Sequence, residues 1–235
     1  MKLVILAGGY GTRLSEETKI KPKPLVKIGN RPIIWHIMKF YSYYGINDFI
    51  ICLGYKGHIL IKELKKFISK ESWNIRFVQT GLKTMTGGRI KKIEKYVSDE
   101  ENFCLSYGDG LSDVNIKNLI NFHKKNKKMA TLTAVRYKNP KGVLIFSNNS
   151  NVKKIKEKPI EYINGGFFVL SKKIFKFLKD SKTVFERDCL PKLTKQKELI
   201  AFKHNGFWAC MDTLREKKEL NKIFKSKEKA WKVWM

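Results

Sequence analysis

Residues 3–14, LVILAGGYGTRL, carry the strongest structural signal in the chain. An apolar run that breaks into glycines is typical of a buried parallel strand followed by a tight turn. In open α/β sheets, turns at the carboxyl ends of strands bind ligands. Gly8, Gly9 and Gly11 would let backbone N–H groups approach a polyphosphate, and Arg13 could neutralise its charge. The glycines alone fit an ordinary turn equally well.

Downstream of this loop, apolar runs and helical stripes alternate as far as residue 128, which predicts a parallel sheet with helices on both faces. Apolar residues spaced three and four apart indicate the helices, and short apolar runs that end at glycines indicate the strands. The expected strands are Asp48–Leu53, Trp73–Gln79 and Asn102–Tyr107; the expected helices are Arg31–Tyr44, His58–Ser69, Arg89–Val97 and Asn115–Asn126, the last with Asp113 as N-cap.

Residues 129–235 are richer in strand-like segments and are not separated from the first half by a linker. We therefore expect one domain, 1–235, whose second half either extends the same sheet or packs against it as a lobe. The expected strands are Ala130–Val135, Gly142–Phe146, Asn151–Lys156, Gly165–Leu170, Leu199–Lys203 and Phe207–Met211; the expected helices are Ser171–Leu178, Thr183–Lys195 and Thr213–Phe224.

The composition argues against several classes of protein. A formal charge of +28 suggests nucleic-acid binding, but only seven of the 49 basic residues are arginine and the lysines are scattered along the chain. The four cysteines show no CxxC spacing, which favours free thiols in a reducing compartment. The first apolar run is too short for a signal peptide, and no run approaches the ~20 residues of a membrane span. We expect a cytoplasmic protein.

A second motif, Lys21-Pro-Lys-Pro24, follows the glycine loop. Its prolines stiffen the backbone and fix the direction of Lys23. A rigidly placed lysine suits phosphoryl chemistry, because charge accumulates on the phosphate oxygens during transfer. By itself, the motif is also common in surface turns.

Taken in order, the motifs resemble those of the sugar-1-phosphate nucleotidyltransferase family. The resemblance covers nearly the whole chain, and within the family it is to the cytidylyltransferases that act on glucose 1-phosphate. It implies a Rossmann-like, mostly parallel mixed sheet, transfer from CTP to α-D-glucose 1-phosphate with Mg²⁺, and a homo-oligomer. The motifs are GGYGTRL (8–14), KPKP (21–24), TMTGGRI (84–90), SYGDGLSD (106–113), EKP (157–159), INGGFFVL (163–170) and GFWACMDTLRE (206–216).

The resemblance also assigns roles to individual residues. Arg13, Lys23 and Asp109 would be catalytic, and Asp109 and Asp212, each after an apolar strand, would hold the metal ion. Asp212 could instead cap the following helix. The nucleotide would be bound by Leu6, Ala7, Gly8, Gly9, Gly11, Thr12, Arg13, Lys23, Thr84, Thr86, Gly87, Gly88, Arg89 and Asp109; the sugar phosphate would be bound by Gly142, Glu157, Lys158, Asn164, Gly165 and Gly166.

The sequence leaves some alternatives open. UTP, dTTP or another sugar 1-phosphate would use the same reaction, and Asn164-Gly-Gly166 could be a hairpin turn rather than a sugar-binding bend. Two segments are shorter than in related cytidylyltransferases: the one between Ile59 and Ile75, and the EKP-to-INGG connection. A non-catalytic nucleotide-sugar sensor would be expected to lack one metal carboxylate. A nucleic-acid-binding protein would show a steep dependence of affinity on salt.

Overall fold

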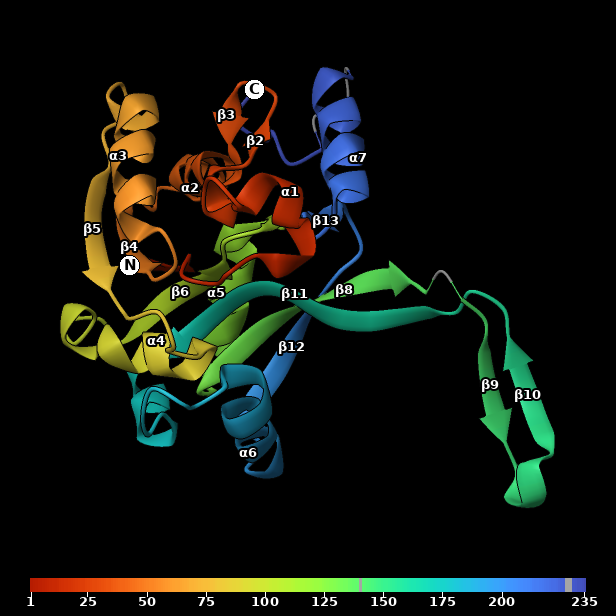
Figure 1. Ribbon diagram of the computed structural model, residues 1–235. Helices are drawn as coiled ribbons and strands as arrows, with labels where there is room; N and C mark the ends of the chain where they lie inside the picture. Colours follow the sequence, from red (N-terminus) through yellow and green to blue (C-terminus); the bar gives the residue numbers. More distant parts are fainter. Residues whose placement is uncertain (140, 227–229) are drawn as a thin grey trace.

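The computed structural model describes residues 1–139, 141–226 and 230–235. Its centre is a seven-stranded sheet with the order β12-β8-β11-β6-β1-β4-β5 (Figure 1). Strand β11 runs antiparallel to its neighbours β6 and β8, and the other pairings in this sheet are parallel. The strands are β1 (Leu3–Leu6), β4 (Asp48–Leu53), β5 (Asn74–Gln79), β6 (Asn102–Tyr107), β8 (Ala130–Lys138), β11 (Ile160–Ser171) and β12 (Leu199–His204).

The open, mostly parallel mixed sheet predicted from the sequence is confirmed. Strands β8, β11 and β12 from the second half continue the sheet begun by the first half, so the second half does not form a separate sheet beside it. The parallel register of β1 between β4 and β6 places the carboxyl ends of all three at one edge. Loops that leave this edge therefore start close together.

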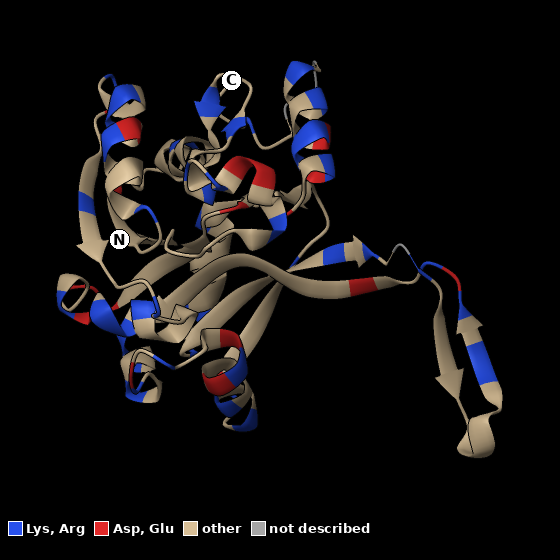
Figure 2. Ribbon diagram, viewed as in Figure 1, with Lys and Arg blue, Asp and Glu red and all other residues tan. Residues whose placement is uncertain are grey.

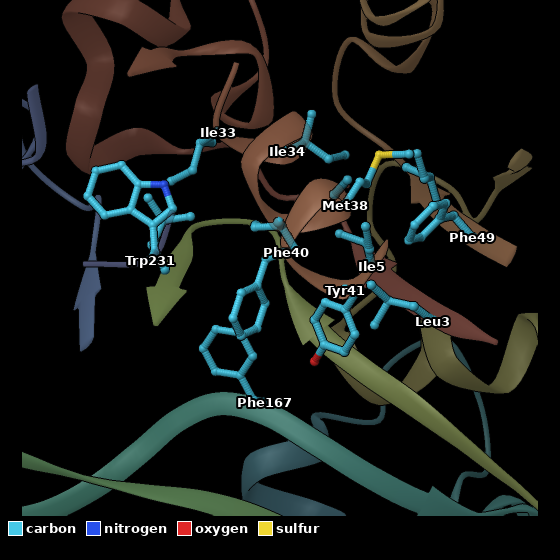
Figure 3. Close-up of a cluster of buried hydrophobic side chains, with 14 of the residues drawn as sticks. Leu3, Ile5, Ile33, Ile34, Met38, Phe40, Tyr41, Phe49, Phe167 and Trp231 are labelled. Carbon is cyan, nitrogen blue, oxygen red and sulfur yellow. The ribbon is translucent and has the colours of Figure 1, made fainter. Parts of the chain in front are cut away.

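Helices cover both faces of the sheet because successive side chains of each strand point to opposite faces. In β1, Leu3 and Ile5 join one buried cluster, whereas Val4 joins the other. Figure 3 shows Ile34 and Met38 beside Leu3 and Ile5, and Phe167 of β11 in the same core. This face carries α2 (Ile33–Tyr43), α3 (Gly57–Ile68), α5 (Ile116–Asn126) and α7 (Leu214–Lys225); the other carries α4 (Thr86–Lys92) and α6 (Leu190–Lys195).

Several predicted helix ends differ from the structure. The helix predicted at Arg89–Val97 begins earlier, at Thr86, and ends at Lys92, where a 3₁₀ turn (Glu94–Tyr96) follows. The start of the predicted helix Thr183–Lys195 is a π-helical turn (Phe185–Cys189) before α6. Asp113 was wrongly predicted as the N-cap of α5.

The N-cap of α5 is Asn115, whose side chain accepts from Asn118 N at 3.0 Å. Asp113 Oδ1 instead lies 2.8 Å from His204 Nε2, because β12 brings that ring to the end of β7 (Gly110–Ser112). A capping residue must lie at the boundary of its helix, and Asp113 lies two residues too early.

A small antiparallel pair of strands lies beside the carboxyl edge of the sheet and links it to the last part of the chain. Strand β7 pairs with β13 (Trp208–Cys210), and Cys210 lies opposite Gly110. Because β7 begins directly after Asp109 and β13 ends shortly before Asp212, this pairing brings the two aspartates side by side. Near this edge lie the short α1 (Ser15–Thr18) and the pair β2 (Lys27–Ile28) with β3 (Arg31–Pro32).

A two-stranded hairpin, β9 (Val143–Phe146) and β10 (Val152–Lys156), extends away from the body of the molecule (Figure 1). The ends of β8 and β11 run toward it, with Ile160 paired to Lys138. Every residue of β10 is exposed, including Ile155. An isolated two-stranded hairpin is at best marginally stable in water, so its apolar surface requires an explanation.

The charged and sulfur-containing residues follow the pattern expected from the sequence. Lysine and arginine are spread over many helices and strands in Figure 2. All four cysteines are free, and Cys52, Cys104 and Cys189 are buried. Among the residues that the structure describes, none of the helices has the length and apolar character needed to cross a membrane.

Candidate active site

The loop after β1 wraps around an open pocket. Gly11 adopts a left-handed conformation, with φ of 67°, and its carbonyl oxygen accepts from Leu14 N at 3.0 Å. The Thr18 hydroxyl donates to the same carbonyl at 3.0 Å, which fixes the turn against α1. A Cβ atom on Gly9 would meet nothing within 4 Å, so packing does not demand glycine there. Its missing side chain leaves room for a ligand to approach the backbone.

Lys23 lies at the centre of the site. Pro22 and Pro24 flank it in a 3₁₀ turn, Lys23–Leu25, which directs the side chain toward the sheet edge. Its ammonium nitrogen lies 2.6 Å from Asp109 Oδ2 and 2.6 Å from Asp212 Oδ1. Burial by itself lowers the pKa of Lys23, but the two carboxylates outweigh it and the pKa is raised. The residue is therefore held in its charged form.

Asp212 is held in place from the start of α7. The N-cap of α7 is Thr213, whose hydroxyl accepts from Glu216 N, so Asp212 is not the cap. Glu216 Oε2 accepts from the backbone N–H groups of Asp212 at 2.7 Å and Thr213 at 2.8 Å. The Asp212 carboxylate itself contacts Lys23 and Arg13 Nη1, the latter at 2.8 Å. The Arg13 side chain is largely exposed and can turn toward a bound phosphate.

The two aspartates form a site that suits a divalent cation. Carboxylate oxygens from Asp109 and Asp212 converge on one cation, the Lys23 ammonium. This ammonium stands in for a metal ion with respect to charge and position. Mg²⁺ prefers hard oxygen ligands and is usually held by one or two carboxylates together with substrate phosphates. The residues present therefore fit the ion that the sequence predicted.

Two adjoining pockets open beside this cluster. The first, which we call the loop pocket, has a volume of about 230 Å³. The second has a volume of about 420 Å³, and we call it the nucleoside pocket after the ligand expected there from the sequence. They share Leu6, Gly9, Gly108 and Asp109, so they form one continuous cleft. The loop pocket also has Ala7, Gly11, Thr12, Arg13, Lys23, Pro24 and Asp212; the nucleoside pocket also has Gly8, Tyr10, Leu82, Lys83, Thr84, Met85, Thr86, Arg89, Tyr107, Val184 and Glu186.

Arg89, which the resemblance assigns to nucleotide binding, is held by contacts within the protein. Its guanidinium group is buried and donates to Leu53 O at 3.0 Å, Thr80 Oγ1 at 2.6 Å and Gly8 O at 2.9 Å. A Cβ atom on Gly8 would lie 2.1 Å from Arg89 Nη1. Arg89 therefore supports the glycine loop from beneath, and Gly8 is small because the guanidinium group lies against it.

Close packing, and not an open ligand surface, explains why residues 87 and 88 are glycines. A Cβ atom on Gly87 would lie 2.8 Å from Thr183 O, and one on Gly88 would lie 2.6 Å from Ser181 Cα. Neither glycine lines the two pockets, whereas Thr84 and Thr86 line the nucleoside pocket. Within TMTGGRI, the glycines pack α4 against the loop around residues 180–184, and the threonines face the cleft.

Asn164, Gly165 and Gly166 lie within one continuous strand, which rules out the hairpin turn considered from the sequence. The register of β11 against β8 shifts between Asn164 and Phe168, a β-bulge. Gly166 has φ of 80°, and its N–H donates to Asn164 Oδ1 at 2.9 Å. Asn164 Nδ2 also donates to the Tyr107 hydroxyl at 3.2 Å, so the bulge joins the carboxyl edge at Tyr107.

Gly142, Glu157 and Lys158 do not share a pocket with Asn164 within one chain, in contrast to the expectation. Glu157 and Lys158 are exposed where the hairpin meets β11 (Figure 1). The short connection after EKP continues directly into β11, and the strand from Ile160 to Asn164 alone spans roughly 13 Å. A longer connection could fold back, whereas this one runs straight toward the hairpin.

The pocket residues that the sequence prediction missed include two with polar side chains that contact each other, Tyr107 and Glu186. Tyr107 ends β6 immediately before the GDG motif, so its position was available from the strand prediction. Glu186 lies in the segment predicted as a regular helix, and only the tertiary packing of that segment against α4 brings it to the cleft.

Comparison with known proteins identifies the family. The model of the nucleotidyl transferase family matches residues 2–225. The chain belongs to this family. The chain is 44% identical over 257 residues to glucose-1-phosphate cytidylyltransferase of Salmonella typhimurium, with full coverage of both chains. It is 42% identical over 256 residues to a probable glucose-1-phosphate cytidylyltransferase of Bacillus subtilis, again with full coverage. This nucleotidyl transferase is therefore a sugar-1-phosphate nucleotidyltransferase by family membership.

Solved structures share the fold of this chain. HddC from Yersinia pseudotuberculosis aligns with a TM-score of 0.77 at 28% identity, covering 95% of this chain and 99% of that one. A UDP-glucose pyrophosphorylase complexed with UDP-glucose aligns with a TM-score of 0.73 at 20% identity, covering 97% of this chain and 99% of that one. At that identity, the second likeness supports the fold alone.

Proposed function

We propose that this nucleotidyl transferase joins CMP from CTP to α-D-glucose 1-phosphate, forming CDP-glucose and pyrophosphate with Mg²⁺. The observation that carries the proposal is the ion cluster of Lys23, Asp109 and Asp212 beside the loop pocket. The choice of substrates rests on the full-length likeness to the Salmonella typhimurium glucose-1-phosphate cytidylyltransferase.

The position of each residue in the cleft suggests its role in the reaction. Backbone groups of Gly9 and Gly11 would receive the triphosphate in the loop pocket, and the exposed Arg13 would close over its outer charges. Asp109 and Asp212 would hold Mg²⁺. When bound, the ion would neutralise phosphate charge and fix the phosphates in line for displacement. Lys23 would then turn from the carboxylates to the phosphate that is transferred.

A general base is not needed for this reaction. The attacking group is a phosphate oxygen that is already ionised at neutral pH, so the chain has only to align it and stabilise the charge that develops. The new bond joins this oxygen to the α-phosphorus of CTP, and the bond to the pyrophosphate leaving group breaks. A fixed lysine at this point acts mainly in the transition state.

The two halves of the chain are assigned to the two substrates. We propose one domain, with residues 1–128 as the nucleotide-binding half and residues 129–235 as the sugar-phosphate-binding half. The buried and free cysteines support a reducing, cytoplasmic location. A homo-oligomer is supported by the projecting hairpin β9–β10, whose apolar residues need a partner surface in water. A second copy could also receive Glu157 and Lys158, which lie away from the cleft of their own chain.

The test is pyrophosphate release measured over a grid of nucleoside triphosphates and sugar 1-phosphates with Mg²⁺. We expect the highest kcat/KM for CTP with glucose 1-phosphate. Cytosine presents an amino donor where uracil presents an acceptor, and a pocket built to receive that donor discriminates by up to about 10⁴–10⁵. The carbonyl of Gly8 already accepts from Arg89 and Tyr55, so the acceptor for cytosine must come from elsewhere in the nucleoside pocket.

If UTP or dTTP equals CTP, the cytidylyl assignment fails and the nucleotidyl transfer remains. Binding of a nucleotide sugar without pyrophosphate release would favour the sensor instead. The presence of both Asp109 and Asp212 in one cluster supports the enzyme. Nucleic-acid binding is expected only as a non-specific association that weakens steeply with salt.

A further inference from the structure

The nucleoside pocket contains a carboxylate besides Asp109, that of Glu186. Its Oε2 accepts from the Thr86 hydroxyl at 2.6 Å, and its Oε1 accepts from the Tyr107 hydroxyl. Glu186 is half-buried, and neither of these partners carries a charge. The carboxylate is therefore fixed in direction from two sides while its negative charge is not neutralised by either contact.

A carboxylate held in this way can still accept further hydrogen bonds. An ionised carboxylate offers about four lone-pair sites, and the two hydroxyls use one on each oxygen. Its charge repels phosphate groups, so it suits an uncharged donor on the substrate. Hydroxyl and amino groups are the donors of this kind that a nucleotide sugar carries.

The hydrogen bonds of Tyr107 indicate that the donor to Glu186 is a hydroxyl group of the hexose. The Tyr107 hydroxyl accepts from Asn164 Nδ2 at 3.2 Å while it donates to Glu186. Glu186, Tyr107 and Asn164 thus form one line of hydrogen bonds from the π-helical turn, across the end of β6, to the bulge of β11. Tyr107 stands two residues before Asp109, which is proposed to hold the metal ion at the reacting phosphates. A hexose attached to such a phosphate would lie beside this line.

We propose that Glu186 accepts hydrogen bonds from the hydroxyl groups of the hexose and is a specificity-determining residue of the sugar site. This inference rests on the proposed function. Within one chain Glu186 supplies the contact expected of Glu157, which lies exposed at the base of the hairpin. Because Thr86 and Tyr107 orient the carboxylate, the distinction among sugars depends on which hydroxyls it can reach.

Calorimetric binding of CDP-glucose and of CDP to the full chain tests the assignment. Glu186→Gln keeps the size of the side chain and removes its charge. We expect it to weaken CDP-glucose about ten- to hundredfold, as loss of a hydrogen bond to a charged acceptor commonly does, and to leave CDP within about twofold. In turnover, KM for glucose 1-phosphate should rise while KM for CTP stays unchanged. Glu161→Gln, an exposed change of the same charge on β11, is the matched control.

Sugar 1-phosphates that lack single hydroxyls provide a readout that a purely structural role would not change. Wild-type protein should lose affinity for at least one deoxy analogue, and Glu186→Gln should no longer distinguish that analogue from glucose 1-phosphate. Equal weakening of CDP and CDP-glucose, or a changed ratio of CTP to UTP alone, would place Glu186 at the nucleotide and overturn the assignment. Unchanged binding of both ligands in the variant would also overturn it.

The two proposals fail in different ways. Wild-type protein that binds neither ligand and releases no pyrophosphate would overturn the proposed function, and this assignment with it. Wild-type binding that Glu186→Gln fully retains would overturn this assignment alone. A urea midpoint close to that of wild type is expected in Glu186→Gln, because one hydroxyl can still donate to the amide oxygen and the other can accept from the amide nitrogen.

Discussion

Lys23 and Asp212 are 189 residues apart in sequence and form an ion pair of 2.6 Å in the structure. The same ammonium group contacts Asp109 at 2.6 Å. The lysine comes from the turn after the glycine loop, and the aspartates come from the ends of two paired strands. Three parts of the chain therefore meet at one charge cluster, in which a single ammonium group contacts two carboxylates.

Removal of either carboxylate that is proposed to hold the metal ion should abolish most activity. We expect Asp109→Asn and Asp212→Ala each to lower kcat by on the order of 10²–10³, as loss of a fixed charge-stabilising group commonly does. Circular dichroism should show an intact fold. Steady-state pyrophosphate release at saturating Mg²⁺ provides the measurement, with Asp99→Asn, an exposed site paired to Lys2, as control. Turnover close to wild type in either variant would remove that residue from the metal site.

Lys23 should compete with the metal ion when no nucleotide is bound. Replacing it in Lys23→Met leaves two adjacent carboxylates without their cation, so Mn²⁺ should bind the nucleotide-free protein more tightly, while kcat falls. Electron paramagnetic resonance of Mn²⁺ measures the affinity. Lys21→Met, which removes a lysine paired with Glu17, is the matched control. Weaker or equal Mn²⁺ binding in Lys23→Met would show that the lysine does not occupy the ion's position.

Arg89 should contribute to stability rather than to triphosphate binding. Arg89→Met removes the three hydrogen bonds to Leu53, Thr80 and Gly8, and we expect a loss of about 1–3 kcal/mol in the free energy of unfolding. Urea denaturation measures the loss, and Arg76→Met at an exposed site is the control. Unchanged stability together with much weaker CTP binding would return Arg89 to the role expected from the sequence.

The buried His36 should make the fold less stable in acid. Burial lowers the pKa of His36 to about 4, since the charged ring is poorly solvated there. Its Nε2 lies 3.0 Å from Ile28 O, and Nδ1 receives a hydrogen bond from Trp231 at 3.3 Å, which requires the unprotonated nitrogen. A histidine in the unfolded chain has a pKa near 6.5. As pH falls, the unfolded chain therefore takes up the proton first.

The resulting stabilisation is complete above about pH 6.5 and is lost as pH falls toward 4, by on the order of 3 kcal/mol. The measurement is the free energy of unfolding of wild type and His36→Gln across this range. The variant should lose less stability than wild type on acidification, and the exposed His58→Gln should follow wild type. Parallel curves for wild type and His36→Gln would contradict the assignment.

The hairpin β9–β10 should mediate self-association. Phe146 is 58% and Ile155 is 64% exposed, although both are large and apolar. Introducing charge with Phe146→Asp and Ile155→Asp should lower the molar mass seen by light scattering, since an apolar contact is lost. Lys153→Asp, on the same hairpin, is the control for a change of charge. A molar mass that stays the same in the double variant would exclude the hairpin from the interface.

The glycine loop, the strand before it and the position of Asp109 were accessible from the sequence because each depends on local pattern. An apolar run that ends at Gly8 must turn there, and an aspartate just after a strand of a parallel sheet must lie at its carboxyl edge. Asp212 reaches the same edge only through the antiparallel pairing of β13 with β7. The order of the motifs then led to the family. The helix ends were less accessible, because Thr86 begins α4 through its contact with Phe185, a residue about a hundred positions away.

Tertiary structure decided which motif residues face the cleft. Arg89 and Thr86 lie in the same short segment, but packing buries the first beneath the glycine loop and turns the second toward Glu186. Lys158 belongs to the EKP motif, and yet it lies between β10 and β11, where the chain passes from the hairpin into the sheet, away from the cleft. The sequence pattern shows which functional groups are present and which segments form helices or strands. The distances between these groups depend on long-range strand pairing and on close packing of side chains, and no local pattern contains that information.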